Sequence, residues 1–194
     1  MYTVIGSAKT RAARVLWLLE ELGQPYTHIA AAPQSPEARA HNPVGKVPTL
    51  LDGSASITDS TAILTYLADK HGALTAPAGS PARARQDSLT HFLLDEFDAL
   101  LWTSARHSFV LPEDMRLPAI KTSLKWEYAR SLTRLSAWLQ GPYLMGDEMT
   151  VPDIIAAHCL AWGIAIKFPD PDNSLGDYLT HMRERPAIAR AMSA

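Results

Sequence analysis

Residues 42–61, NPVGKVPTLLDGSASITDST, carry the local signals that decide the fold of this chain. Pro48 precedes a short apolar run. Proline has no N–H to donate, but at the start of a strand this removes no hydrogen bond from the sheet. The Asp-Gly pair at residues 52–53 is typical of a hairpin turn into a second strand. The side chains of residues 58–60, TDS, have oxygens that can cap a helix, and the apolar residues that follow them have helical spacing. The predicted order is therefore proline, strand, turn, strand and capped helix.

The chain before this stretch has the pattern of a strand, a helix and a second strand. Residues 2–5 favour a strand, residues 10–22 carry apolar positions at helical spacing, and residues 26–30 again favour a strand. Pro36 marks the start of a short helix. Strands joined in this way are typically parallel, with a right-handed crossover. We therefore expect residues 1–75 to form one α/β domain.

The rest of the chain has a helical pattern. The composition of residues 72–81, GALTAPAGSP, is typical of a linker, which we place at residues 76–82. Beyond it, apolar residues recur at helical spacing over five segments: 83–107, 115–139, 154–166, 174–183 and 186–192. The sequence TVPD at residues 150–153 is a helix-capping signature. Residues 83–194 are therefore expected to form an all-helical domain.

Composition narrows the classes of function. The chain has 194 residues, 47% of them apolar, and a net charge of -2, so it has enough apolar residues for a core and no broad basic field for nucleic acid or an anionic membrane. Cys159 is the single cysteine, which excludes an intrachain disulfide. The seven histidines show no metal-binding spacing, so we expect no metal. With neither a secretory signal nor a membrane-length apolar run, we expect a cytoplasmic protein.

Four motifs follow one another along the chain in a fixed order. They are Gly6-Ser7 with Thr10-Arg11 before VLWLLEELG, then NPVGKVPTL, Asp59-Ser60, and TVPDIIAAH. In this order and spacing the chain resembles the cytosolic glutathione transferases over nearly its whole length, and most closely the bacterial members with a serine near the first strand. The resemblance implies an α/β thioredoxin-like N-terminal domain followed by an all-α helical C-terminal domain. Ala8 stands where many relatives have proline, and Asp59 replaces a commoner glutamate.

Ser7 and Thr10 are the two candidate catalytic hydroxyls. In a thioredoxin-like unit the reactive sulfur sits where the first strand gives way to the helix, and Ser7 occupies that place. A hydroxyl there can donate a hydrogen bond to a bound thiolate, which a helix N-terminus also favours. One charge-assisted bond of about 1.5 to 3 kcal/mol lowers a thiol pKa by about one or two units. We predict Ser7 as the catalytic residue and Thr10 as the second candidate. The alternative is that Ser7 only caps the helix.

The resemblance implies that glutathione is bound by Lys46, Val47, Asp59 and Ser60. Val47 is expected to precede a cis proline and to pair its main chain with the cysteinyl residue, as an added strand does. Ser60 and its N–H are placed to hold the γ-glutamyl carboxylate, and Asp59 to accept from the amine. Lys46 is expected to attract the glycine carboxylate with its positive charge, and Gln34 to contribute more weakly to the same contact. Without the resemblance, Asp59 and Ser60 equally suit a plain helix cap, and Lys46 a solvated surface position.

The function implied is that of a glutathione transferase in detoxification. Glutathione, as co-substrate, binds in the first domain, and its sulfur attacks a small hydrophobic electrophile in a pocket to which the helical domain contributes. Residues 102–109, WTSARHSF, either line that pocket or pack in the core. Members of the family are usually symmetric dimers, so we expect a homodimer. The alternative is a non-catalytic protein-binding or regulatory module of the same fold, which would have no need of all the glutathione-binding residues.

Overall fold

The computed structural model describes residues 1–193 of the chain. Contacts divide them into two units: Met1–Ala78 with the C-terminal segment from Arg183, and Gly79–Met182. The division after Ala78 falls inside residues 76–82, where the sequence predicts the linker. The segment from Arg183 differs from expectation. The sequence assigns it to the helical domain, whereas its contacts place it in the first unit.

The first unit is built on a mixed sheet with the strand order β2-β1-β3-β4 among the described residues. The strands are β1 (Tyr2–Ile5), β2 (Tyr26–Ile29), β3 (Thr49–Asp52) and β4 (Ala55–Thr58). β1 runs parallel to β2 and antiparallel to β3, and β3 and β4 form an antiparallel hairpin. This is the sheet of a thioredoxin-like domain, so the predicted α/β unit is confirmed.

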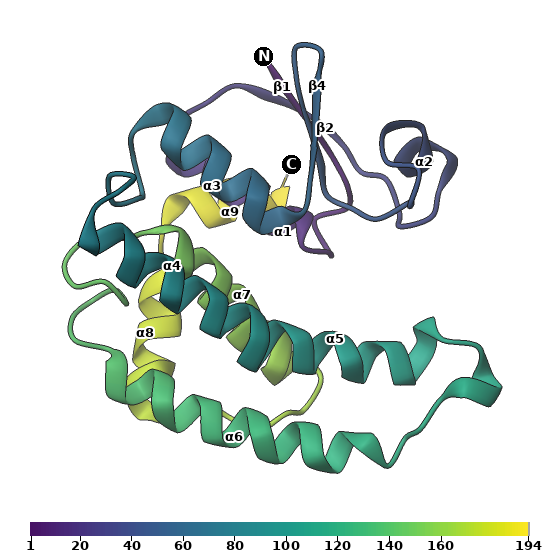
Figure 1. Ribbon diagram of the computed structural model, residues 1–194, viewed down its shortest axis with the longest axis vertical. Helices are drawn as coiled ribbons and strands as arrows, with labels where there is room; N and C mark the ends of the chain where they lie inside the picture. Colours follow the sequence, from purple (N-terminus) through teal and green to yellow (C-terminus); the bar gives the residue numbers. More distant parts are fainter. Residues whose placement is uncertain (194) are drawn as a thin grey trace. The chain divides into compact units, whose positions relative to one another are not determined.

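Helices cover both faces of this sheet (Figure 1). α1 (Ala12–Glu21) and α3 (Ser60–His71) pack together on one side, and α2 (Pro36–His41) lies on the other. α1 is buried on all sides from Ala12 to Leu19, whereas α3 turns one apolar face to the core. The fully buried apolar side chains larger than alanine in these two helices are Val15, Leu16, Leu18, Leu19, Ile63, Leu64 and Leu67.

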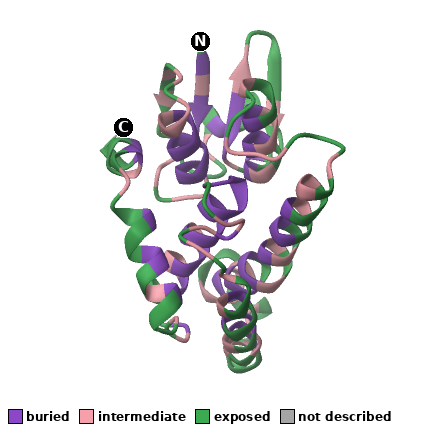
Figure 2. Ribbon diagram, turned by 90° about the vertical axis from the view of Figure 1, so that its left-hand side faces the viewer, coloured by how far each residue is buried: buried purple, intermediate pink, exposed green. Residues whose placement is uncertain are grey.

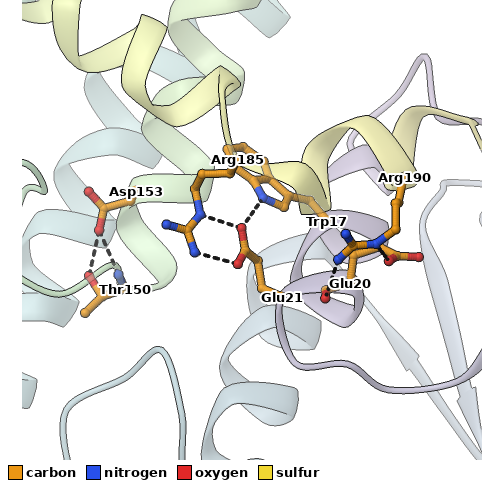
Figure 3. Close-up of polar contacts among 7 residues, drawn as sticks. All are labelled: Trp17, Glu20, Glu21, Thr150, Asp153, Arg185 and Arg190. Carbon is orange, nitrogen blue, oxygen red and sulfur yellow. Dashed lines mark hydrogen bonds and ion pairs between the residues drawn. The ribbon is translucent and has the colours of Figure 1, made fainter.

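The last helix, α9 (Pro186–Ser193), packs on α1 (Figure 3). Nε and Nη2 of Arg185 each lie 2.6 Å from a carboxylate oxygen of Glu21, and Nε of Arg190 lies 2.6 Å from Glu20 Oε2. These pairs explain why α9 belongs to the first unit. Helical spacing identifies the helix but not its partner, so the assignment of α9 could not be made from periodicity.

The regular elements of the second unit are helical, as predicted. One helix runs through four segments: α4 (Pro81–Leu93), η1 (Leu94–Asp98), α5 (Ala99–Ala105) and η2 (Arg106–Val110). It is followed by η3 (Glu113–Met115), α6 (Ile120–Trp138), α7 (Val151–Ala165) and α8 (Asn173–Arg183). Figure 2 shows buried residues along one side of the helices and exposed residues along the other. None of the helices in residues 1–193 has both the length and the apolarity to cross a bilayer.

Two details of these helices differ from the sequence expectation. η1 and η2 are π-helical turns within the long helix, and the predicted helix from residue 115 begins only at Ile120, after a 3-10 turn. A π turn adds one residue to a helical turn, and the spacing of apolar residues does not show so small an insertion. Pro118 explains the late start, because the residue before a proline is disfavoured in a helix.

The core of the second unit contains a chain of aromatic rings. Phe97 and Tyr128 meet edge to face with ring centres 5.1 Å apart, and Tyr128 meets Phe168 in the same way at 5.3 Å. Gly163 of α7 faces this chain, because a Cβ built there would lie 2.3 Å from the Tyr128 hydroxyl. α6 and α7 therefore approach closely at a position that only glycine fills.

The predicted capping signature at the start of α7 is confirmed (Figure 3). Oδ2 of Asp153 accepts from the N–H of Thr150 at 2.8 Å and from its hydroxyl at 3.0 Å. Oδ1 accepts from the Leu144 N–H at 2.8 Å and from the Tyr178 hydroxyl at 3.0 Å. Asp153 is fully buried, so these four donors replace the water that its carboxylate would otherwise bind.

Candidate active site

One end of the sheet gathers the segments that carry the predicted site residues. Ile5 is in register with Ile29 on one side and with Thr49 on the other, and Thr49 is in register with Thr58. These four residues form a single row across the sheet. Beyond that row lie the loop after β1, the residues before β3 and the start of α3. The strand register therefore brings the segments of Ser7, Val47 and Ser60 to the same edge.

The Ser7 hydroxyl keeps its hydrogen available. Its oxygen accepts a hydrogen bond from the N–H of Lys9 at 3.3 Å, and no group in residues 1–193 accepts from it. The main chain of Ser7 is held separately, with its N–H donating to the Ala31 carbonyl at 2.9 Å. α1 begins only at Ala12, with Arg11 at the N-cap position, so Ser7 is not the residue that caps this helix.

Thr10 has a different environment. Its hydroxyl donates to the carbonyl of Ser7 at 2.7 Å and accepts from the N–H of Ala12 at 3.2 Å. Its hydrogen is therefore already committed inside the loop, whereas that of Ser7 is not. Of the two predicted hydroxyls, Ser7 is the one that can donate to a ligand without first breaking a bond.

Val47 lies against the loop after β1 and precedes a cis peptide bond, as the resemblance implies. A Cβ at Gly6 would lie 2.9 Å from the Val47 Cβ, and Gly6 has a φ of +138°, so the close approach requires glycine. The N–H and C=O of Val47 take part in no hydrogen bond within residues 1–193. A peptide ligand would find both groups unpaired.

Asp59 and Ser60 differ in the hydrogen bonds that they make at the start of α3. Asp59, with a φ of +72°, caps α3 by accepting at Oδ1 from the N–H groups of Thr61 at 2.9 Å and Ala62 at 3.0 Å. Its second carboxylate oxygen makes no hydrogen bond with the described residues. Ser60 is 3% exposed, and its N–H and hydroxyl have no partner within residues 1–193. The cap is thus made by Asp59 alone.

Lys46 is exposed and forms no ion pair with the described residues. Gln34 differs from expectation, because its side chain is engaged within the protein. Its amide nitrogen donates to the Val44 carbonyl at 3.0 Å, and its oxygen accepts from Nη2 of Arg39 at 2.5 Å. Gln34 thus orders the loop before Lys46. Arg39, a second cation beside that loop, was not among the predicted residues.

His28 is a polar contact of the Ser7 loop that the sequence reasoning missed. Its Nε2 lies 2.8 Å from the carbonyl oxygen of Gly6, the residue before Ser7. The available signal is the period of two along β2, which places Tyr26 and His28 on the same face of the strand. That signal gives a face but no partner, so the contact with Gly6 could not be predicted.

The second unit contains a cavity of about 360 Å³ between its long helix and α6. Its lining includes five charged side chains: Asp95, Glu96, Glu127, Arg130 and Arg134. Of the predicted WTSARHSF segment, only Thr103 reaches it. This charged cavity does not have the apolar character expected for a hydrophobic electrophile.

Comparisons with known proteins agree with this architecture. Residues 10–78 match the sequence model of the glutathione S-transferase N-terminal domain. Glutathione S-transferase GstA of Escherichia coli O157:H7 is 27% identical over 161 residues, which span 80% of this chain and 76% of that protein. These similarities cover the thioredoxin-like unit and extend into the helical unit.

Solved structures show the same likeness along the whole chain. The theta class glutathione S-transferase of Xanthomonas axonopodis pv. citri, with glutathione bound, has a TM-score of 0.79 and 28% identity over 100% of this chain and 97% of that one. The glutathione S-transferase of Xylella fastidiosa shares the fold, with a TM-score of 0.87 and 20% identity over 100% of this chain and 98% of that one. Residues 10–78 thus match the glutathione S-transferase N-terminal domain, and the chain as a whole shares the fold of the glutathione S-transferases.

Proposed function

We propose that this protein is a glutathione transferase, in which Ser7 holds the thiolate of glutathione for attack on a small hydrophobic electrophile. The observation that supports the proposal is the row of residues at one end of the sheet, beyond which the segments of Ser7, Val47 and Ser60 emerge. Two strand spacings of about 4.8 Å separate β1 from β4, or about 10 Å. An extended tripeptide, at about 3.4 Å per residue, has nearly the same length.

The unpaired polar groups at this edge can each bind one polar group of glutathione. The N–H and C=O of Val47 pair with the cysteinyl main chain, as an added strand would. The hydroxyl and N–H of Ser60, at the start of α3, receive the γ-glutamyl carboxylate, and the second oxygen of Asp59 accepts from the amine. Lys46 faces the glycine carboxylate as a point charge. This arrangement places the sulfur near the loop after β1.

The chemical step in this proposal is thiolate attack, and the protein's part is to favour the deprotonated sulfur. The Ser7 hydroxyl donates its free hydrogen to the sulfur and still accepts from Lys9. Such a bond is stronger to an anion than to a thiol, so it lowers the thiol pKa by about one or two units. The sulfur lone pair then forms the bond to the electrophilic atom, and the leaving group takes with it the electron pair of the bond that breaks.

The first test is an ultraviolet titration of the glutathione thiolate bound to the protein. Ser7→Ala should raise the apparent pKa of the bound thiol by about one or two units, because the donor is lost. Ser60→Ala is the matched control, since it removes a hydroxyl from the same site but not from the sulfur. It should weaken glutathione binding and leave that pKa nearly unchanged. An unaltered titration in Ser7→Ala would remove Ser7 from its role.

The second test separates an enzyme from a binding module. The solved structure of Ure2p in complex with glutathione shares this fold with a TM-score of 0.80 at 21% identity, so the fold alone does not distinguish an enzyme from a binding module. The purified protein should be retained on immobilised glutathione and should turn over at least one electrophile from a panel of aryl halides, epoxides and peroxides. Retention without any turnover would favour the module.

We also propose a homodimer acting in the cytoplasm, which analytical ultracentrifugation and cell fractionation would check.

A further inference from the structure

We propose that His28 is a positioning residue for Ser7, acting through the peptide bond that joins Gly6 to Ser7. This inference rests on the proposed role of Ser7 and goes beyond it, because His28 lies on a different strand and has no part in binding glutathione. Nε2 of His28 lies 2.8 Å from the carbonyl oxygen of Gly6. Within residues 1–193, no other side chain bonds to this carbonyl.

Both ends of the Gly6–Ser7 peptide are held by hydrogen bonds. The carbonyl oxygen of Gly6 is bound by His28, and the N–H of Ser7 donates to the Ala31 carbonyl at 2.9 Å. A peptide group is planar and moves as one rigid plate. Two bonds on opposite edges of the plate prevent its rotation about the chain. They fix the orientation of this peptide. The N–H and the hydroxyl of Thr10 hold the Ser7 carbonyl at 2.9 and 2.7 Å, so the next peptide is held as well. The two peptides together fix the direction in which the Cα–Cβ bond of Ser7 leaves the backbone.

The loop after β1 needs such support from outside, because the backbone at Gly6 can adopt many conformations. Gly6 has a φ of +138°, and glycine has little intrinsic preference among its conformations. A side chain at this position is barred, since a Cβ would lie 2.9 Å from the Val47 Cβ and 3.0 Å from the Ala12 Cβ. The glycine that permits close approach thus cannot stiffen the loop. His28 and the carbonyls of Ile29 and Ala31 supply the rigidity instead.

The geometry also determines the tautomer of His28. A carbonyl oxygen can only accept, so the hydrogen must be carried by Nε2. In the parallel register His28 stands opposite Val4, and its imidazole reaches forward along β1 to the carbonyl two residues later. To bond to the Gly6 carbonyl, a side chain at position 28 needs a hydrogen-bond donor about as far from its Cα as Nε2 of histidine. Glutamine places its amide nitrogen at about that distance, whereas methionine has similar length and no donor.

Two substitutions of His28 test the inference. His28→Met should raise the apparent pKa of the bound glutathione thiol and lower kcat by about fivefold to tenfold, with KM for glutathione nearly unchanged. His28→Gln should restore both values to within about twofold of the parent, because it replaces the donor. Tyr26→Phe is the matched control on the same strand. It removes a hydrogen bond to Glu20 far from the loop, and should leave the thiol pKa unchanged.

A measurement on the unsubstituted protein is independent of whether the variants fold. A long-range ¹⁵N–¹H spectrum of the histidine rings should show His28 with its hydrogen on Nε2, and an Nδ1–H tautomer would overturn the inference. Unchanged titrations in His28→Met, with a raised thiol pKa in Ser7→Ala, would overturn the role of His28 and leave the proposed function standing. If neither substitution alters the thiol pKa, the role of Ser7 is wrong and that of His28 fails with it.

Discussion

At the scale of single residues, the Ser7 and Thr10 hydroxyls lie in one loop but make different hydrogen bonds. The Ser7 oxygen only accepts, so its hydrogen remains for a ligand, while Thr10 both donates to the Ser7 carbonyl and accepts from Ala12. The sequence predicts a helix from residue 10, whereas α1 begins only at Ala12, so Thr10 lies in the loop with Ser7. The sequence could not rank the two hydroxyls by geometry. The ranking depends on which carbonyl lies within reach, and that is set by the turn before α1.

Thr10 is predicted to support the loop rather than the chemistry. Thr10→Val keeps the shape of the side chain but removes the donor to Ser7, leaving that carbonyl with only the N–H of residue 10. We expect a loss of about 1 kcal/mol in the free energy of unfolding, measured by urea denaturation. Thr10→Ser should behave like the parent. A thiol pKa raised as far by Thr10→Val as by Ser7→Ala would instead make Thr10 the donor to the sulfur.

Gly6 is predicted to tolerate no side chain. Gly6→Ala places a Cβ 2.9 Å from that of Val47 at a positive φ, so either the loop or the residues before β3 must move. The expected loss in unfolding free energy is about 1 to 3 kcal/mol, together with weaker glutathione binding. Gly146→Ala is the control, because its φ of +112° is likewise one that L side chains rarely adopt and no atom lies within 4 Å. Equal losses in the two variants would show that contact with Val47 is unimportant.

At the scale of elements, the contact of α9 with α1 depends on the ionised carboxylate of Glu21. Burial alone would raise the pKa of Glu21, but hydrogen bonds from Arg185 and Trp17, and the charge of Arg185, hold it below its ordinary value. A carboxylate with a lowered pKa in the folded state contributes stability above its unfolded pKa and loses it as pH falls through the folded pKa. The contact is therefore stable at neutral pH and weakens in acid.

Glu21→Gln is predicted to lose stability at neutral pH but not in strong acid. The parent should unfold at higher urea concentration than the variant at pH 7, and the difference should shrink below about pH 4 as Glu21 takes up its proton. Arg190→Ala is the control, because the Arg190 side chain is 55% exposed and its pair with Glu20 contributes less. A difference that stays constant down to pH 2 would contradict this account of α9.

The packing of α6 on α7 gives a prediction with an internal control. Gly163→Ala forces a Cβ against the Tyr128 hydroxyl, so we expect a loss of about 1 to 3 kcal/mol in unfolding free energy. Gly176→Ala, in α8, meets no atom within 4 Å and should be neutral or stabilising by up to about 1 kcal/mol. Thermal unfolding of the two variants measures both effects. A stable Gly163→Ala variant would mean that the aromatic chain can rearrange.

At the scale of the whole molecule, the sequence predicts what depends on local pattern. The strands, α1, α3 and the cap of α7 follow from apolar spacing, the Asp-Gly turn and the TVPD signature, because each of these acts within a few residues. The pairs of α9 with α1, and the contact of His28 with Gly6, join residues that are distant in the sequence. Those contacts are set by tertiary packing, which periodicity does not encode. The resemblance to the family supplied the cis bond before Pro48, which no local signal gives.

A crystal structure of the protein with glutathione bound tests the central claim most directly. The account predicts the Ser7 oxygen within hydrogen-bond distance of the glutathione sulfur, the cysteinyl main chain paired with Val47, and the γ-glutamyl carboxylate at Ser60. A sulfur held by another group, with the Ser7 hydroxyl turned away and Val47 unpaired, would contradict it.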